Sequence, residues 1–409
     1  MKKTILKKYA NLLIRKGLNV QPGQEVEIIA SLDQPEFVKM CVEEAYKAKA
    51  KSVKVRWNYQ PLEKLHINNQ KLKDLSTLSN ETKAMWEHRE EALPCMLYLV
   101  SDDPDGMNGT NFAKYAKARK EQMKWIKPLR KRMENKYQWC IAGVPGEAWA
   151  KKIYPNLSKH QAVEALWQTI LDVSRVNDDP LKAWDEHNAD LEKRCAYLNS
   201  LEIDFLEYHS ESGGTNFKVW PNPNAIWEGG NEKALGSNIV FNPNIPSEEV
   251  FTSPTKGKAE GIVYASKPLS YNGKLIENFW IKFENGKAVD FDAEEGKDLL
   301  KEIIETDENS CYLGECALVP YHSPIQDSGV LFYETLYDEN AACHLALGMG
   351  FTNLIKNYEN YSQEELYAMG INDSSTHVDF MIGTKDLNIV AHTKDGKTIQ
   401  IFKDGNWAF

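Results

Sequence analysis

The pattern of the chain changes near its middle, and this change constrains the fold more than any other feature of the sequence. In the first half, residues 26–30 and 53–57 are short and rich in β-branched residues, as strands are. Residues 34–50, between them, carry apolar side chains at helical spacing. A strand, a helix and a second strand form a βαβ unit, whose two strands are parallel.

Residues 96–100 and 139–142 are expected to be further strands of the same sheet. Residues 144–199 have a helical pattern and are expected to connect this part to the rest of the chain. The sequence contains neither GxGxxG nor GxxxxGK[ST], so the α/β layering does not itself indicate a bound nucleotide.

From about residue 200 onward, short apolar runs alternate with Asn-Gly and Asp-Gly pairs, a strong signal for β-hairpins. These pairs are Asn272-Gly273, Asn285-Gly286, Asp395-Gly396 and Asp404-Gly405. Two helices are expected to interrupt the strands, one over residues 296–306 and one over residues 338–347.

A chain of 409 residues is too long for a single core, so two domains are the default expectation. We predict an α/β N-terminal domain in residues 1–199. We predict an α+β C-terminal domain, with a mostly antiparallel sheet, in residues 200–409.

The charge and cysteine content favour a soluble cytoplasmic protein. The net charge of −10 argues against nucleic acid as the main partner, since phosphate binding needs a positive surface. The basic stretch 114–132 is expected to be a solvated helix face, with a nucleic-acid groove as the alternative. The seven cysteines are scattered without a CxxC, which suits a reducing compartment. No signal peptide or apolar run of transmembrane length is present, so no membrane partner is expected.

The most informative segment for chemistry is the short, β-prone stretch 376–383. Side chains alternate across a strand, so His377, Asp379 and Met381 share one face, while Val378 and Phe380 point to the other. Burying an imidazole and a carboxylate without a partner or a metal is costly. The segment therefore indicates either a hydrogen-bonded His–Asp pair in the core or two ligands of one cation.

Three other places in the second part offer further ligands. Glu339 lies at an expected helix start, with His344 five residues later; the alternative is a capped helix with a core histidine. Glu315 is a lone carboxylate in an apolar run, either buried near a cation or exposed at a sheet edge. One carboxylate of the pair Glu248-Glu249 can face the same site, but periodicity does not decide which.

Taken together, these places would supply four carboxylates and two imidazoles. That is too much negative charge for one tetrahedral Zn²⁺, and it suits two divalent cations. Because no cysteine need be a ligand, Zn, Co and Mn are candidates. The sequence has neither the HExxH zinc motif nor the GxSxG nucleophile motif, which makes the corresponding mechanisms less suitable.

Four ordered stretches resemble the metallo-aminopeptidases of the aminopeptidase T and aminopeptidase S type. They are NPNIPSEEVFT (242–252), GECALVP (314–320), DENAACH (338–344) and HVDFMIG (377–383). The resemblance implies a cytoplasmic, homodimeric hydrolase that releases N-terminal residues from peptides with a free N-terminus. It also implies two divalent metal ions (Zn, Co, Mn or Mg). Carried across motif by motif, its metal ligands fall on Glu249, Glu315, Glu339, His344, His377 and Asp379.

The chain departs from the family pattern at Phe351. The family places a tyrosine seven residues after the histidine that matches His344, and a phenyl ring can neither bind metal nor donate a hydrogen bond to an oxyanion. We expect an aminopeptidase in which Glu315 moves the proton from water to the leaving amine. The alternative is a metal-binding protein with weak or lost peptidase activity. A further possibility is hydrolysis of another amide by the same core, and Tyr358 or Tyr361 could replace the missing hydroxyl.

Overall fold

The structure is a computed structural model that describes residues 1–271 and 273–409. The chain folds into two compact units. The first contains residues 1–184 and 231–245, and the second contains residues 185–230 and 246–409. A short segment beyond residue 200 thus belongs to the first unit, while the domain boundary at residues 199 and 200 stays a prediction.

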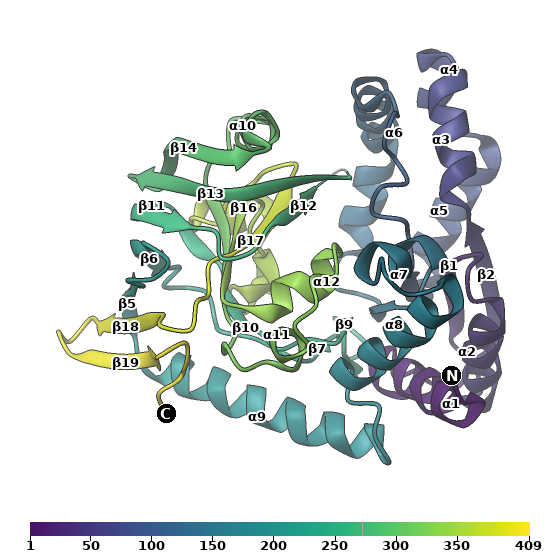
Figure 1. Cartoon of the computed structure of the whole chain (residues 1–409), viewed down its shortest axis with the longest axis horizontal. Coiled ribbons are helices and arrows are strands. Elements are labelled where there is room, and N and C mark those ends of the chain that lie inside the picture. The colour runs from purple at the N-terminus through teal and green to yellow at the C-terminus, as the bar shows by residue number, and fades with distance from the viewer. Residues whose placement is uncertain (272) are drawn as a thin grey trace. The chain divides into compact units, whose positions relative to one another are not determined.

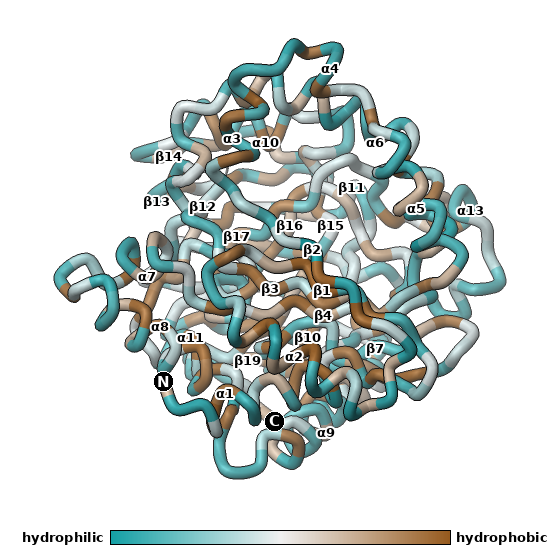
Figure 2. The backbone as a smooth tube through the Cα atoms, turned by 90° about the vertical axis from the view of Figure 1, so that its right-hand side faces the viewer, coloured by the Kyte–Doolittle hydropathy of each residue, from teal (hydrophilic) through white to brown (hydrophobic). Residues whose placement is uncertain are grey.

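The first unit is built on a parallel sheet with the strand order β2-β1-β3-β4-β9. Its strands are β1 (Glu25–Ser31), β2 (Ser52–Asn58), β3 (Cys95–Val100), β4 (Trp139–Gly143) and β9 (Asn244–Ile245). The four strands predicted in this part are confirmed. Strands β1, β3 and β4 are largely hydrophobic (Figure 2), as expected where a parallel sheet is covered on both faces.

Helices precede, connect and follow these strands (Figure 1). They are α1 (Lys3–Leu12), α2 (Pro35–Lys47), α3 (Gln60–Asn69), α4 (Leu72–Ser76), α5 (Asn80–Ala92), α6 (Phe112–Met133), α7 (Glu147–Ile153), α8 (Lys159–Val173) and α9 (Pro180–Ser200). The predictions of helix between β1 and β2, over the basic stretch and over most of residues 144–199 are confirmed. Helix α8 begins with a capping box in which Ser158 and Gln161 exchange hydrogen bonds with each other's backbone.

The second unit contains a large, mostly antiparallel sheet with the order β12-β13-β11-β6-β5-β18-β19-β20, and β14 pairs with β13. Its strands are β5 (Ile203–His209), β6 (Asn216–Pro221), β11 (Pro254–Tyr264), β12 (Leu269–Tyr271), β13 (Lys274–Glu284), β14 (Lys287–Glu295), β18 (Asn388–Thr393), β19 (Thr398–Lys403) and β20 (Asn406–Trp407). The hairpin turns predicted at Asn285-Gly286, Asp395-Gly396 and Asp404-Gly405 are confirmed. The turn predicted at Asn272-Gly273 includes Asn272, which lies outside the described residues.

A smaller antiparallel sheet has the order β10-β15-β16-β17. It is formed by β10 (Val250–Thr252), β15 (Leu313–Leu318), β16 (His344–Gly348) and β17 (His377–Met381). The helix predicted over residues 296–306 is confirmed as α10 (Lys297–Ile304). The strand predicted around His377 is also confirmed.

The helix predicted over residues 338–347 is wrong. Helix α12 (Thr335–Asp338) and a 3-10 turn (Glu339–Ala341) end before His344, which begins strand β16. Residues 340–348 are all buried. An apolar run that is buried on both sides has no periodicity to separate a buried strand from a buried helix.

The predicted fold class is confirmed, since an α/β region precedes an α+β region with mostly antiparallel sheets. Among residues 1–271 and 273–409, none of the helices combines the length and the apolar character that a membrane span requires.

Candidate metal centre

One face of the smaller sheet carries most of the predicted site residues. Glu315 of β15 pairs with Ala346 of β16, which pairs in turn with Asp379 of β17. Directly opposed residues in antiparallel strands point to the same side of the sheet. His344 and His377 lie two residues before Ala346 and Asp379, so their side chains share that side.

The other face of this sheet packs into the hydrophobic core of the second unit. Val250, Cys316, Leu345, Val378 and Phe380 alternate with the site residues and are buried in that core. The alternation predicted for the strand around His377 therefore separates a chemical face from a packing face. Because one face is buried, a one-residue slip of register would reverse the two sets, and this fixes the register.

The potential ligand atoms form two groups that share Glu315. Glu249, Glu315 and His344 form one group, and Glu315, His377 and Asp379 form the other. Within each group the ligand atoms lie within 4.8 Å of one another. Glu249, rather than Glu248, is the member of the adjacent pair that joins a group.

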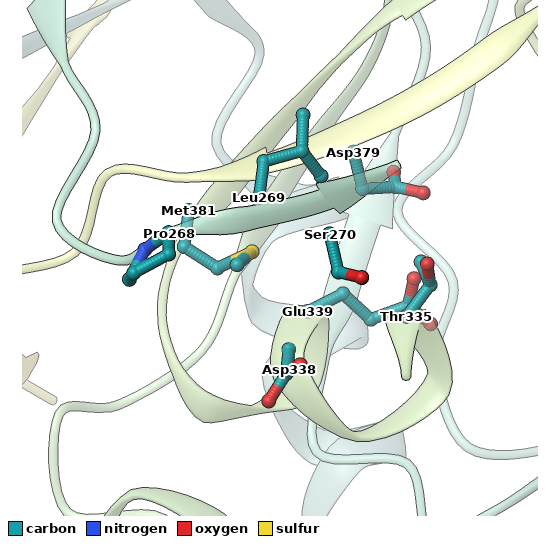
Figure 3. A pocket seen from close by; sticks show the side chains of 8 residues that line it. All are labelled: Pro268, Leu269, Ser270, Thr335, Asp338, Glu339, Asp379 and Met381. Atoms are coloured by element: carbon teal, nitrogen blue, oxygen red, sulfur yellow. The ribbon is translucent and has the colours of Figure 1, made fainter. Parts of the chain in front are cut away.

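Glu339 lies beside these groups, in the 3-10 turn that follows α12. Its side chain and that of Asp379 line one small pocket together with the hydroxyl groups of Ser270 and Thr335 (Figure 3). Burial raises the pKa of Glu339 well above its ordinary value, and the neighbouring carboxylate of Asp379 raises it further. All six predicted ligands are therefore in one region of the second unit, although Glu339 belongs to neither compact group.

Both histidines are oriented through Nδ1. Nδ1 of His344 lies 3.1 Å from the carbonyl oxygen of Ala342, and Nδ1 of His377 lies 2.7 Å from that of Met349. A proton on each Nδ1 is donated to the carbonyl, which turns Nε2 toward the carboxylates. A hydrogen bond from the distal nitrogen to a backbone carbonyl is the usual support of a metal-ligating histidine.

Each Nε2 faces carboxylate oxygens. Nε2 of His344 lies 3.1 Å from Glu249, and Nε2 of His377 lies 3.0 Å from Glu315 and 3.2 Å from Asp379. Burial disfavours the charged imidazolium of His344, but the bond with Glu249 and the charges of the surrounding carboxylates together outweigh it and raise the pKa of His344 to about 9. Burial likewise disfavours the charged form of His377, but the charges of Asp379 and Glu315 and the hydrogen bonds with them raise its pKa well above its ordinary value.

The environment of Glu315 also favours its protonated form. Burial raises the pKa of Glu315 to about 7, against the hydrogen bond from His377, and the charges of Glu249 and Asp379 add to the rise. Buried carboxylates this close repel each other unless positive charge lies between them. The cluster is thus suited to exchange its protons for divalent cations.

The residues present fit such cations. Oδ1 of Asp379 is buried without a hydrogen-bond partner, although it lies 3.2 Å from Nε2 of His377. A buried oxygen without such a partner costs free energy, and a cation would satisfy it. The oxygen and nitrogen donors match Zn, Co and Mn, and no thiol is among them.

Phe351 packs directly against the site. Its ring centroid lies 4.9 Å from that of His377, and the ring of Phe251 meets it in an edge-on contact at 5.6 Å. Tyr358 packs instead against a separate small cluster around Leu366, and Tyr361 is exposed. The packing of Tyr358 against this cluster and the exposure of Tyr361 do not support a role for either hydroxyl in place of the missing one.

Two features of the site lay beyond the sequence analysis. Asn340 accepts a hydrogen bond from the backbone N–H of Glu248, next to Glu249, and no local sequence pattern predicts this contact. The backbone carbonyls that orient the two histidines carry no sequence signal. Cys343 is buried and donates to the carbonyl of Val319, and burial raises its pKa to about 12, which disfavours the reactive thiolate form.

Comparison with known proteins identifies relatives over nearly the whole chain. Aminopeptidase AmpS of Bacillus subtilis is 41% identical, with 99% of this chain and 98% of the relative covered. Aminopeptidase 2 of Geobacillus stearothermophilus is 40% identical over the same shares. A solved structure of wild-type AmpT from Thermus thermophilus superposes with a TM-score of 0.90 at 32% identity and covers all of both chains.

Residues 2–407 match the family described as thermophilic metalloprotease (M29). The match includes every stretch on which the resemblance to aminopeptidases T and S rests. The chain belongs to the M29 family of thermophilic metalloproteases.

Proposed function

We propose that this protein is a metal-dependent aminopeptidase that uses two divalent cations. The observation that carries the proposal is the pair of ligand groups that share Glu315. Membership of a metalloprotease family and relatives named as aminopeptidases support a metallo-exopeptidase. The substrate class is peptides with a free N-terminus.

Glu249, Glu315, Glu339, His344, His377 and Asp379 would hold the cations. Cations bound there would polarise the scissile carbonyl and lower the pKa of an attacking water. Glu315 is our candidate for the general base, because it is the one carboxylate that both ligand groups share and would therefore lie beside a water bound by either cation. In this scheme Glu315 accepts the proton of the attacking water and delivers it to the leaving amine.

Phe351 contributes an apolar wall rather than a hydroxyl, since its ring covers part of His377. The cations alone would then stabilise the oxyanion that forms from the scissile carbonyl, because no hydroxyl group is present at position 351 to donate a hydrogen bond to it. The identity of the native cation, the cytoplasmic location and the homodimeric state all remain predictions that the resemblance implies.

The deciding experiment compares a leucyl peptide with its N-acetylated twin, before and after Co²⁺ or Zn²⁺ is added to chelator-treated protein. An aminopeptidase cleaves only the free peptide, and only with metal. Cleavage of the acetylated peptide would indicate another amide hydrolase. Failure to cleave either peptide while metal is demonstrably bound would contradict the proposal and favour the binding protein.

A further inference from the structure

The side chain of Asn340 joins the two segments that carry Glu249 and Glu339. Oδ1 accepts a hydrogen bond from the backbone N–H of Glu248 at 2.7 Å. Nδ2 donates to the carbonyl of Leu336 at 2.9 Å and to Oε1 of Glu339 at 3.4 Å. One amide therefore contacts a candidate ligand on one side and the residue next to a candidate ligand on the other.

These contacts are protected from water, because Asn340 is completely buried. A buried donor or acceptor that loses its partner costs far more than an exposed one. The contact with Glu248 bridges 92 residues of sequence. Glu248 is the chain neighbour of Glu249. The hydrogen bond from the Glu248 N–H to Asn340 therefore restrains the backbone that carries the Glu249 carboxylate.

The same segment is supported from α9. Nε2 of His187 lies 2.7 Å from the carbonyl oxygen of Ser247 and donates to it. His187 thus helps to fix the segment before Glu249 from the side of α9. Asn340 differs, because it fixes the segment of Glu249 relative to that of Glu339.

We propose that Asn340 is a positioning residue of the metal centre, which sets the placement of the Glu249 carboxylate relative to that of Glu339. This inference rests on the proposed function. Replacing a residue that hydrogen-bonds to a metal ligand, and so orients it, typically weakens metal affinity about 10- to 100-fold. Asn340 would act in this way through the Glu248 backbone and through the Glu339 carboxylate.

The test is a titration of chelator-treated protein with Co²⁺. Binding is measured by calorimetry and, separately, by the absorption bands of the bound ion. Asn340→Ala is expected to weaken Co²⁺ binding about 10- to 100-fold. The matched control is Asn222→Ala. Asn222 is also buried, and its amide binds the backbone of Met369 and Asn224 rather than a ligand-bearing segment.

The expected result is weakened binding in Asn340→Ala with near wild-type binding in Asn222→Ala. Equal affinities in wild type and Asn340→Ala would overturn the inference, and so would equal losses in the two variants. If Asn340→Ala does not fold, Asn340→Ser keeps a shorter polar group, and wild-type affinity in that variant would overturn the inference too. Wild-type protein that binds no Co²⁺ would instead contradict the proposed function itself.

Discussion

Glu315 and Asp379 lie opposite the same residue, Ala346, on the strand between theirs. On the intervening strand, only the methyl group of Ala346 lies between these two buried carboxylates. The next residue along this face of β16 is Gly348, opposite His377. Because Ala346 and Gly348 are small, they leave space above β16, between the side chains of β15 and β17. Cations would be bound in this space.

Filling this space is expected to weaken metal binding. Ala346→Val adds two methyl groups beside Glu315 and Asp379, and overpacking of a core costs about 1–3 kcal/mol. The control is Ala391→Val on β18, which overpacks a fully buried alanine of the larger sheet. Only Ala346→Val should weaken Co²⁺ binding, whereas both variants should lower the melting temperature. Unchanged Co²⁺ affinity in Ala346→Val would place the cations elsewhere.

Glu315→Gln is expected to abolish turnover while the fold stays intact. Loss of a general base typically costs about 10²–10⁴ in rate, and Glu315 is in addition shared by both ligand groups. The measurement is kcat on a leucyl peptide at saturating metal, with circular dichroism as a check of folding. Glu364→Gln, an exposed substitution on α13 (Gln363–Ala368), is the control and should retain activity. Full activity in Glu315→Gln would rule out Glu315 as the base.

The strand of His377 and Asp379 was predictable from sequence, because the alternation of polar and apolar side chains along a strand is a local property. The convergence of the six candidate ligands was not predictable from spacing alone. It depends on the order β10-β15-β16-β17, in which neighbours in the sheet are far apart in the chain. The choice of Glu249 over Glu248 came only from the family resemblance, since neither residue lies on a strand whose alternation could decide it.

The expected helix at His344 shows the limit of local patterns. The run around it is buried on every side, so helix and strand would both bury it. Backbone pairing with neighbouring strands decides for the strand, because β16 pairs with β15 on one side and with β17 on the other. The role of Asn340 was equally hidden, since its partner Glu248 lies 92 residues away.

Phe351→Tyr tests whether a hydroxyl at this position assists the reaction. The aromatic ring already packs on His377, so a tyrosine ring needs no new backbone conformation. Removal of an oxyanion donor costs about 10²–10³ in kcat, which sets the upper bound for a gain. We expect kcat to rise while KM changes little. The control is Phe251→Tyr, which adds a hydroxyl to the neighbouring ring and should not raise kcat. A fall of kcat in Phe351→Tyr would show that the apolar wall itself is needed.

Asp307 is expected to stabilise the segment that leads into β17. Its carboxylate accepts hydrogen bonds from the backbone N–H of Ser375 at 2.7 Å and from the hydroxyl groups of Ser374 and Ser375. Hydrogen bonds to a charged group contribute about 1.5–3 kcal/mol. Asp307→Asn is therefore expected to lower the free energy of unfolding at pH 7 by about that amount, measured by urea denaturation. The exposed neighbour Asp373, replaced by Asn, is the control.

The contribution of Asp307 should depend on pH with a defined sign. Burial alone would raise its pKa, but the bonds from Ser375, Asn309 and Ser374 outweigh burial and lower it from 3.8 to about 2. A carboxyl whose pKa is depressed by folding stabilises the protein above its unfolded value and loses this effect as the pH falls through the folded value. The difference in stability between wild type and Asp307→Asn should thus be constant above about pH 5 and should shrink between about pH 4 and 2. A difference that stays the same down to about pH 2 would mean that the side chain acts by shape rather than by charge.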